Sequence, residues 1–262
     1  MTSRHNYVLF SIACLSGIAV RTVMLLFTID PVSGFIYIDY TPHAIGLISV
    51  LVIAGALIFA LAFFSKINRD SKVSLSTLPF QIACSVMAAA IGFETFLSPL
   101  LSKSNAVQTY VLYFLAAGAM AALISITVFG MLKKPFHPAI TLLPVAYWIM
   151  RLIIVFTDFS TISTISETVI ETFTMCLTLA VLLFYAKLEC DQIRPSSYRL
   201  VAATALLNGY LCAVGSVPRI FLTVLSLEQP THMNIIPATT GLATAVFSAA
   251  LGFTILHSLR DK

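Results

Sequence analysis

The chain has 262 residues, of which 59% are hydrophobic and only 10% are charged, and its formal net charge is +4. Soluble domains carry about a quarter charged residues, so the composition indicates a membrane-embedded protein. The connections between the apolar stretches are short, which leaves no room for an aqueous catalytic module such as a kinase or a nuclease.

Eight apolar stretches are long enough to cross a bilayer, for which an α-helix needs about 20 residues. We therefore predict an all-α bundle of eight transmembrane helices that forms a single polytopic domain over residues 1–262. The spans are expected near 7–28, 43–64, 78–98, 107–132, 138–157, 166–187, 198–227 and 235–257.

The basic residues predict how the bundle is oriented. Eleven of them fall on the side that holds both termini, whereas only Lys103 falls on the opposite side. Cytoplasmic loops carry an excess of Lys and Arg, so both termini are predicted to be cytoplasmic. The positive net charge thus follows from topology and gives no reason to expect a nucleic-acid partner. Short loops favour a bacterial cytoplasmic (inner) membrane as the location.

The first and last hairpins share residue spacings that predict an internal repeat. Cysteine, glycine, arginine and an acidic residue recur at the same intervals, although apolar helices also match by chance. The matching sets are Cys14, Gly17, Arg21 and Asp30 in the first hairpin and Cys212, Gly215, Arg219 and Glu228 in the last. If all consecutive helices pair in this way, the bundle contains four quasi-repeated hairpins, arranged around one axis along the membrane normal as in some transporters.

Three arginines lie inside apolar spans at a similar depth. Arg21, Arg151 and Arg219 each precede an acidic residue at the outer end of their span by seven to nine residues, which places them about 10–14 Å from that end. A charged side chain at the centre of a membrane helix costs about 2.5–3.5 kcal/mol on insertion scales. These arginines should therefore be paired, hydrated or functional.

Two glutamates at comparable depth are candidate partners. Glu94 and Glu171 lie in the third and sixth spans. One interpretation is structural, because interhelical ion pairs can fix helix packing without much net stability. The other is a binding site, in which the arginines hold an anionic or zwitterionic solute and the glutamates neutralise the empty site or carry a proton. Glu94 is the proposed proton carrier, since it is the only ionisable group in its span.

The seventh span contains a candidate helix break. It is about 30 residues long and includes Gly215 and Pro218 directly before Arg219. Proline cannot donate a backbone hydrogen bond to the preceding turn, so a kink or a break is expected there. A broken helix would free backbone groups for a ligand.

Two aromatic residues precede Arg151 on the same helix face. Tyr147 and Trp148 lie four and three residues before it. They are candidates for lining a pocket or for holding the guanidinium by a cation–π contact. Packing is the alternative for both.

The sequence offers little for metal, cofactor or enzyme chemistry. No two histidines are spaced to bind one ion from a single helix, and no catalytic motif of a metalloprotease or serine hydrolase occurs. We therefore expect no metal and no cofactor. The leading hypothesis is a small permease for an anionic or zwitterionic solute. The alternatives are a non-transporting sensor or partner subunit with structural ion pairs and, less supported, an enzyme acting on lipid head groups.

Overall fold

A computed structural model describes residues 3–29, 36–65, 73, 75–97, 106–134, 137–158, 165–225 and 235–258. Within these ranges eight helices are long and apolar enough to cross a membrane. They are α1 (Ser3–Phe27), α2 (Thr41–Phe63), α3 (Leu78–Leu97), α4 (Ala106–Met131), α5 (Leu142–Asp158), α6 (Ile165–Glu189), α7 (Tyr198–Val224) and α8 (Ile235–Ser258). The predicted all-α, eight-helix, multi-pass membrane protein is confirmed.

The helices begin and end where local residues favour it. Pro42 lies at the start of α2, where its missing N–H is not needed. Before α5, the His137 side chain accepts a hydrogen bond from the Ala139 N–H at 3.3 Å and so caps a short 3-10 turn. After α6, Asp191 adopts a left-handed conformation with φ of 53°. The Gln192 N–H then bonds to the Lys187 carbonyl at 3.0 Å, the pattern that satisfies the last carbonyls of a helix.

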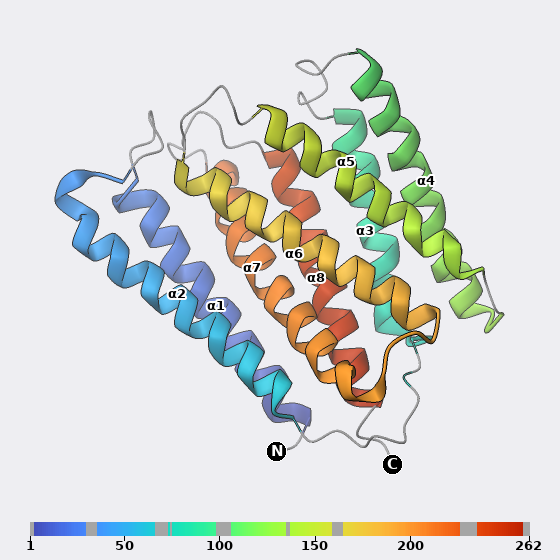
Figure 1. Cartoon of the computed structure of the whole chain (residues 1–262). Coiled ribbons are helices and arrows are strands. Elements are labelled where there is room, and N and C mark those ends of the chain that lie inside the picture. The colour runs from blue at the N-terminus through green and yellow to red at the C-terminus, as the bar shows by residue number, and fades with distance from the viewer. Residues whose placement is uncertain are drawn as a thin grey trace.

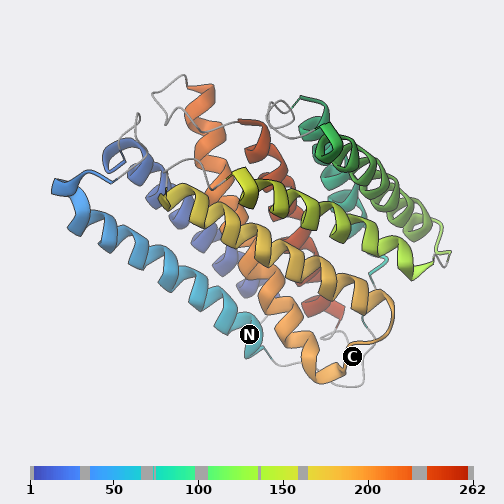
Figure 2. The ribbon, with the colours of Figure 1, turned by 45° about the horizontal axis from the view of Figure 1, so that its top comes forward.

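Six of the helices form a closed ring. Each of α7, α8, α3, α4, α5 and α6 contacts the next, and α6 returns to contact α7. The α1–α2 hairpin packs outside this ring against α7 (Figures 1 and 2). Consecutive helices therefore do pair as hairpins, but the four hairpins do not surround one axis, and the arrangement differs from the predicted array in this respect.

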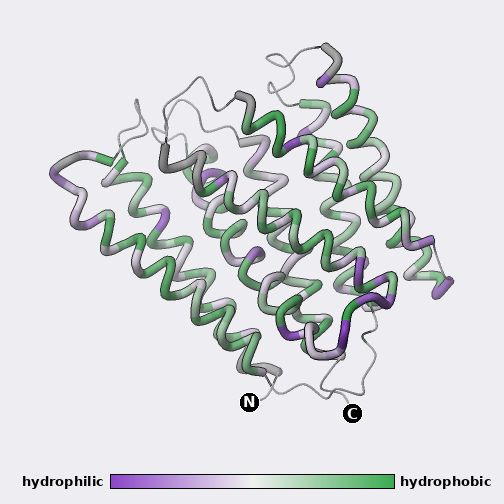
Figure 3. The backbone as a smooth tube through the Cα atoms, in the orientation of Figure 1, coloured by the Kyte–Doolittle hydropathy of each residue, from purple (hydrophilic) through white to green (hydrophobic). Residues whose placement is uncertain are grey.

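Apolar residues run along most of each helix, as Figure 3 shows. On α2, for example, Val52 and Leu57 are exposed, which is the composition expected of a surface covered by lipid. Hydrophilic segments gather at helix ends, notably at the connection between α6 and α7 (Figure 3). The beginning of α1 and the end of α8 lie at the same end of the bundle (Figure 1). That this end is cytoplasmic stays a prediction.

The centre of the molecule is the tightly packed pair of α7 and α8. A Cβ atom added at Gly209 would lie 3.1 Å from the Ala249 nitrogen and 3.2 Å from the Ala245 carbonyl oxygen. The two backbones therefore approach each other as closely as small residues in membrane helices permit. These two helices also carry much of the buried core, including Tyr210 and Phe247.

Helix α7 is continuous through Gly215 and Pro218, so of the predicted kink or break the structure does not show a break. Both residues lie inside one α-helix that runs from Tyr198 to Val224. A proline removes only its own N–H from the ladder of backbone hydrogen bonds, and membrane helices tolerate this where neighbouring helices pack around the site. Pro218 is buried against such neighbours.

Candidate functional site

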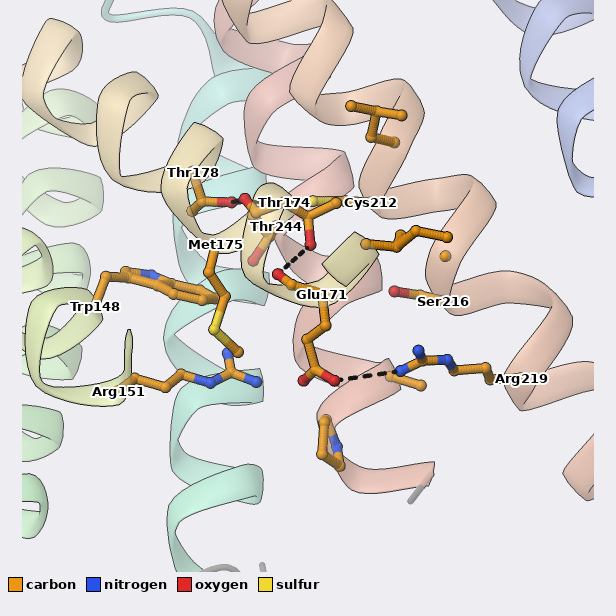
Figure 4. A pocket seen from close by; sticks show the side chains of 16 residues that line it. Trp148, Arg151, Glu171, Thr174, Met175, Thr178, Cys212, Ser216, Arg219 and Thr244 are labelled. Atoms are coloured by element: carbon orange, nitrogen blue, oxygen red, sulfur yellow. Dashed lines mark hydrogen bonds and ion pairs between the residues drawn. The ribbon is translucent and has the colours of Figure 1, made fainter. Parts of the chain in front are cut away.

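A small cavity lies between α5, α6, α7 and α8 in the half of the ring that holds the arginines. Its volume is about 50 Å³, which is room for a few water molecules or one small ion. Two of the predicted arginines, Arg151 and Arg219, line it together with Glu171, Trp148 and Gly215. Figure 4 shows these side chains converging from three different helices.

Arg151 forms a close ion pair with Glu94. Its Nη2 atom donates to Oε1 of the glutamate at 2.7 Å, and the two side chains are only 7% and 5% exposed. This is the length of a charge-assisted hydrogen bond. Glu94 approaches from α3 and lies next to Thr240 of α8. Glu94 does not line the cavity, and its carboxylate balances the charge of Arg151 from the α3 side.

The guanidinium of Arg151 also lies over an aromatic ring. Its Cζ atom is 4.5 Å from the centroid of the Trp148 ring, so the cation–π contact considered from the sequence is present. Tyr147 is buried and packs at 6.0 Å between ring centroids against Trp148. Its hydroxyl neighbours Thr95 rather than the cavity. Trp148 is thus a wall of the cavity, whereas Tyr147 is a packing residue.

Glu171 projects between two guanidinium groups. Its Oε2 atom lies 3.9 Å from Nη1 of Arg219, and its side chain is 30% exposed. The charge of Arg151 interacts with the same carboxylate from the opposite side. Figure 4 shows the Glu171 carboxylate in the gap between the two arginine heads. The contact with Arg219 is longer than a charge-assisted hydrogen bond, so this glutamate is held loosely.

Arg21 does not join the cavity. It is buried on α1, where Nη1 donates to the Met24 sulfur at 4.0 Å. One turn earlier, Gly17 packs against Tyr210 of α7. Arg21 is close enough to Arg219 for their charges to repel each other. The expected convergence of three arginines therefore holds for Arg151 and Arg219, while Arg21 lies on the α1 side of α7.

Several buried N–H groups beside the cavity have no hydrogen-bond partner among the residues that the structure describes. They are Nε and Nη1 of Arg151 and Nε1 of Trp148, and both residues line the cavity. Buried polar groups in native proteins nearly always have a partner, so each exception calls for an explanation such as water or an ion. All three atoms are donors. Each is fully buried, so water or an anion in the cavity would reach them only after a shift of the surrounding side chains.

Hydroxyl groups form the rest of the polar lining and were missed from the sequence. Thr174, Thr178, Ser216 and Thr244 all line the cavity. Taken singly, Ser and Thr in apolar helices bond to the preceding turn, as Thr178 does to the Thr174 carbonyl at 2.8 Å. Only the three-dimensional arrangement brings them together, so periodicity gave no signal.

A buried amide continues this polar layer away from the cavity. Asn208 Nδ2 donates to Thr178 Oγ1 at 3.1 Å and to Ser248 Oγ at 2.9 Å. A single asparagine in a long apolar span is a signal that sequence reasoning could have used, because such residues usually bond across helices.

Three aromatic side chains fill the interior of the six-helix ring on the far side of Asn208 from the cavity. Phe80, Tyr185 and Phe247 come from α3, α6 and α8 and have centroid separations of 5.4, 5.5 and 5.9 Å. All three are among the largest fully buried side chains. They lie toward the end of the bundle that holds the beginning of α1, opposite to the cavity.

Comparison with known proteins adds no identification. No protein-family model, no curated protein and no solved structure matches this chain significantly. The site must therefore be interpreted from its own chemistry.

Proposed function

We propose that this protein is a membrane permease for a small anionic or zwitterionic solute, and that the cavity between α5 and α8 is its binding site. The observation that carries the proposal is Arg151. It is buried and uses one nitrogen on Glu94, and its Nε and Nη1 atoms have no hydrogen-bond partner beside the cavity. A guanidinium with N–H groups still available suits carboxylates and other anions, although these two atoms are buried until the cavity wall moves.

The polar layer next to the cavity supports transport. Thr178 lines the cavity and accepts from Asn208, which in turn donates to Ser248 at 2.9 Å. Polar groups inside a membrane protein are costly and often mark the pathway of a substrate. The aromatic cluster of Phe80, Tyr185 and Phe247 would then be the closed end of that pathway.

Binding and flux of simple solutes test the proposal. Purified protein should be stabilised against heat by at least one of chloride, nitrate, formate, acetate, glycine and alanine, because a ligand of the folded state raises stability by mass action. The same solute should enter proteoliposomes. Arg151→Gln should lose at least about tenfold in affinity, equivalent to about 1.4 kcal/mol. Arg199→Gln, at the other end of α7, is the matched control and should behave as wild type.

The alternative role is a non-transporting sensor or partner subunit, and it is favoured by the short Arg151–Glu94 contact of 2.7 Å. In that case none of the solutes stabilises the protein or crosses the liposome membrane. Arg151→Gln should lower thermal stability under either role, because it breaks the buried pair, so the absence of solute binding and flux is the deciding result. That result would refute the permease.

A further inference from the structure

Glu171 is held much less tightly by its arginine than Glu94 is. Glu94 is 5% exposed and 2.7 Å from its arginine, whereas Glu171 is 30% exposed and 3.9 Å from Arg219. The first distance is that of a strong charge-assisted hydrogen bond, and the second is well beyond it. Glu171 therefore occupies the space between two guanidinium groups without being locked there (Figure 4).

The charged groups around the Glu171 carboxylate disfavour the binding of an additional anion while Glu171 is ionised. Arg151 faces it from α5 with Glu94 of α3 behind, and Arg219 faces it from α7. Cys212 of α7 also lines the cavity, Arg21 of α1 lies beyond Arg219, and the lining residues of α8 are not ionisable. Arg151, Arg219, Glu94 and Glu171 sum to zero formal charge, and Arg21 adds one positive charge beyond Arg219. An added anion would repel the Glu171 carboxylate strongly in a buried site.

We propose that the solute is a small monovalent anion that replaces the Glu171 carboxylate between Arg151 and Arg219, and that it binds together with one proton taken up by Glu171. This inference rests on the proposed function and specifies its substrate class and its coupling. A cavity of about 50 Å³ suits a small anion such as a halide, nitrate or a short carboxylate. Proton and anion enter from the same side, an O–H bond forms on Glu171, and the net charge of the site does not change.

The proposed proton-binding residue is Glu171, whereas the sequence analysis had suggested Glu94. Glu94 is held by Arg151 behind the cavity wall, so its protonation would break a buried ion pair without vacating the anion position. Protonation of Glu171 removes a negative charge from the position that the anion needs. Only Glu171 of these two lines the cavity.

Anion binding measured against pH tests this coupling. Titrations of the purified protein with chloride, nitrate, formate and acetate should be run at several pH values, with proton uptake followed in weak buffer. Affinity should rise about tenfold for each pH unit lowered, over the range in which Glu171 is ionised in the empty site and protonated in the anion-bound site, because one proton is then bound with each anion. Glu171→Gln should bind at all pH values with the low-pH affinity of wild type and take up no proton. Glu189→Gln, at the other end of α6, should retain the wild-type pH dependence.

The outcomes separate the two proposals. If wild-type protein binds none of these anions or the amino acids at any pH, the permease proposal fails and this inference falls with it. If wild type binds an anion with the same affinity at every pH, only the coupling inference is overturned. It is also overturned if folded Glu171→Gln loses binding altogether, or if Glu94→Gln rather than Glu171→Gln removes the pH dependence.

Discussion

The Nη2 atom of Arg151 lies 2.7 Å from Oε1 of Glu94 and thereby joins α5 to α3 across the interior of the ring. These helices are not neighbours in the ring order, since α4 stands between them in sequence and contacts both. The pair is therefore a crosslink as well as part of the cavity wall. Only Oε1 of Glu94 makes this close contact with the guanidinium, and Thr240 of α8 lies next to the same carboxylate.

Removing one member of this pair should be more harmful than removing both. Glu94→Gln or Arg151→Gln leaves an uncompensated buried charge, which costs about 3–5 kcal/mol. The double variant leaves two neutral groups and should be markedly more stable than either single variant. Thermal unfolding in detergent measures the difference. Equal losses in the single and double variants would show that the charges do not interact.

The close contact of α7 and α8 gives a prediction about packing. Gly209→Ala would place a methyl group 3.1 Å from the Ala249 nitrogen, and backbone atoms cannot move aside as a side chain can. Overpacking of this kind costs about 1–3 kcal/mol, so the melting temperature should fall. Gly46→Ala on α2 is the matched control, because nothing lies within 4 Å of its added Cβ. It should be neutral or slightly stabilising, and similar losses at both glycines would contradict the packing argument.

The sequence was sufficient to predict the helices because a membrane span has a strong compositional signal. Length and hydropathy located all eight helices found in the described residues. Arg151, Arg219 and Glu171, for which the depth argument predicted a common level, all line the cavity. Neither prediction needed knowledge of how the helices pack, since the 1.5 Å rise per residue fixes depth by itself.

Arrangement within the membrane plane could not be predicted in the same way. Arg21 has the same depth as Arg219, but α1 lies outside the ring and carries it away from the cavity. That α7 continues through Pro218 could not be predicted either, because the neighbours that stabilise it belong to other helices. Apolar residues surround each helix, so periodicity does not tell which face meets lipid and which meets protein.

If the aromatic cluster of Phe80, Tyr185 and Phe247 closes the pathway, a smaller side chain in it should let the bound anion pass more freely. Phe247→Ala should therefore allow faster passive flux of the bound anion through proteoliposomes, without loss of anion affinity, because the polar cavity lies at the other end. Phe96→Ala is the control, since Phe96 is 76% exposed on the outer surface of α3. Unchanged flux in a folded Phe247→Ala variant would show that this cluster only packs the core.

The orientation of the bundle can be tested with native and introduced cysteines. Cys190 is exposed between α6 and α7, on the side where most basic residues lie and which is predicted to be cytoplasmic. In a background with the other four cysteines replaced by serine, a membrane-impermeant maleimide should label it only after cells are opened. Asp39→Cys, made in a background that also lacks Cys190, places an exposed thiol at the opposite end of α2 and should be labelled in intact cells. Labelling of Cys190 in intact cells would reverse the topology, and the cavity would then face the cytoplasm.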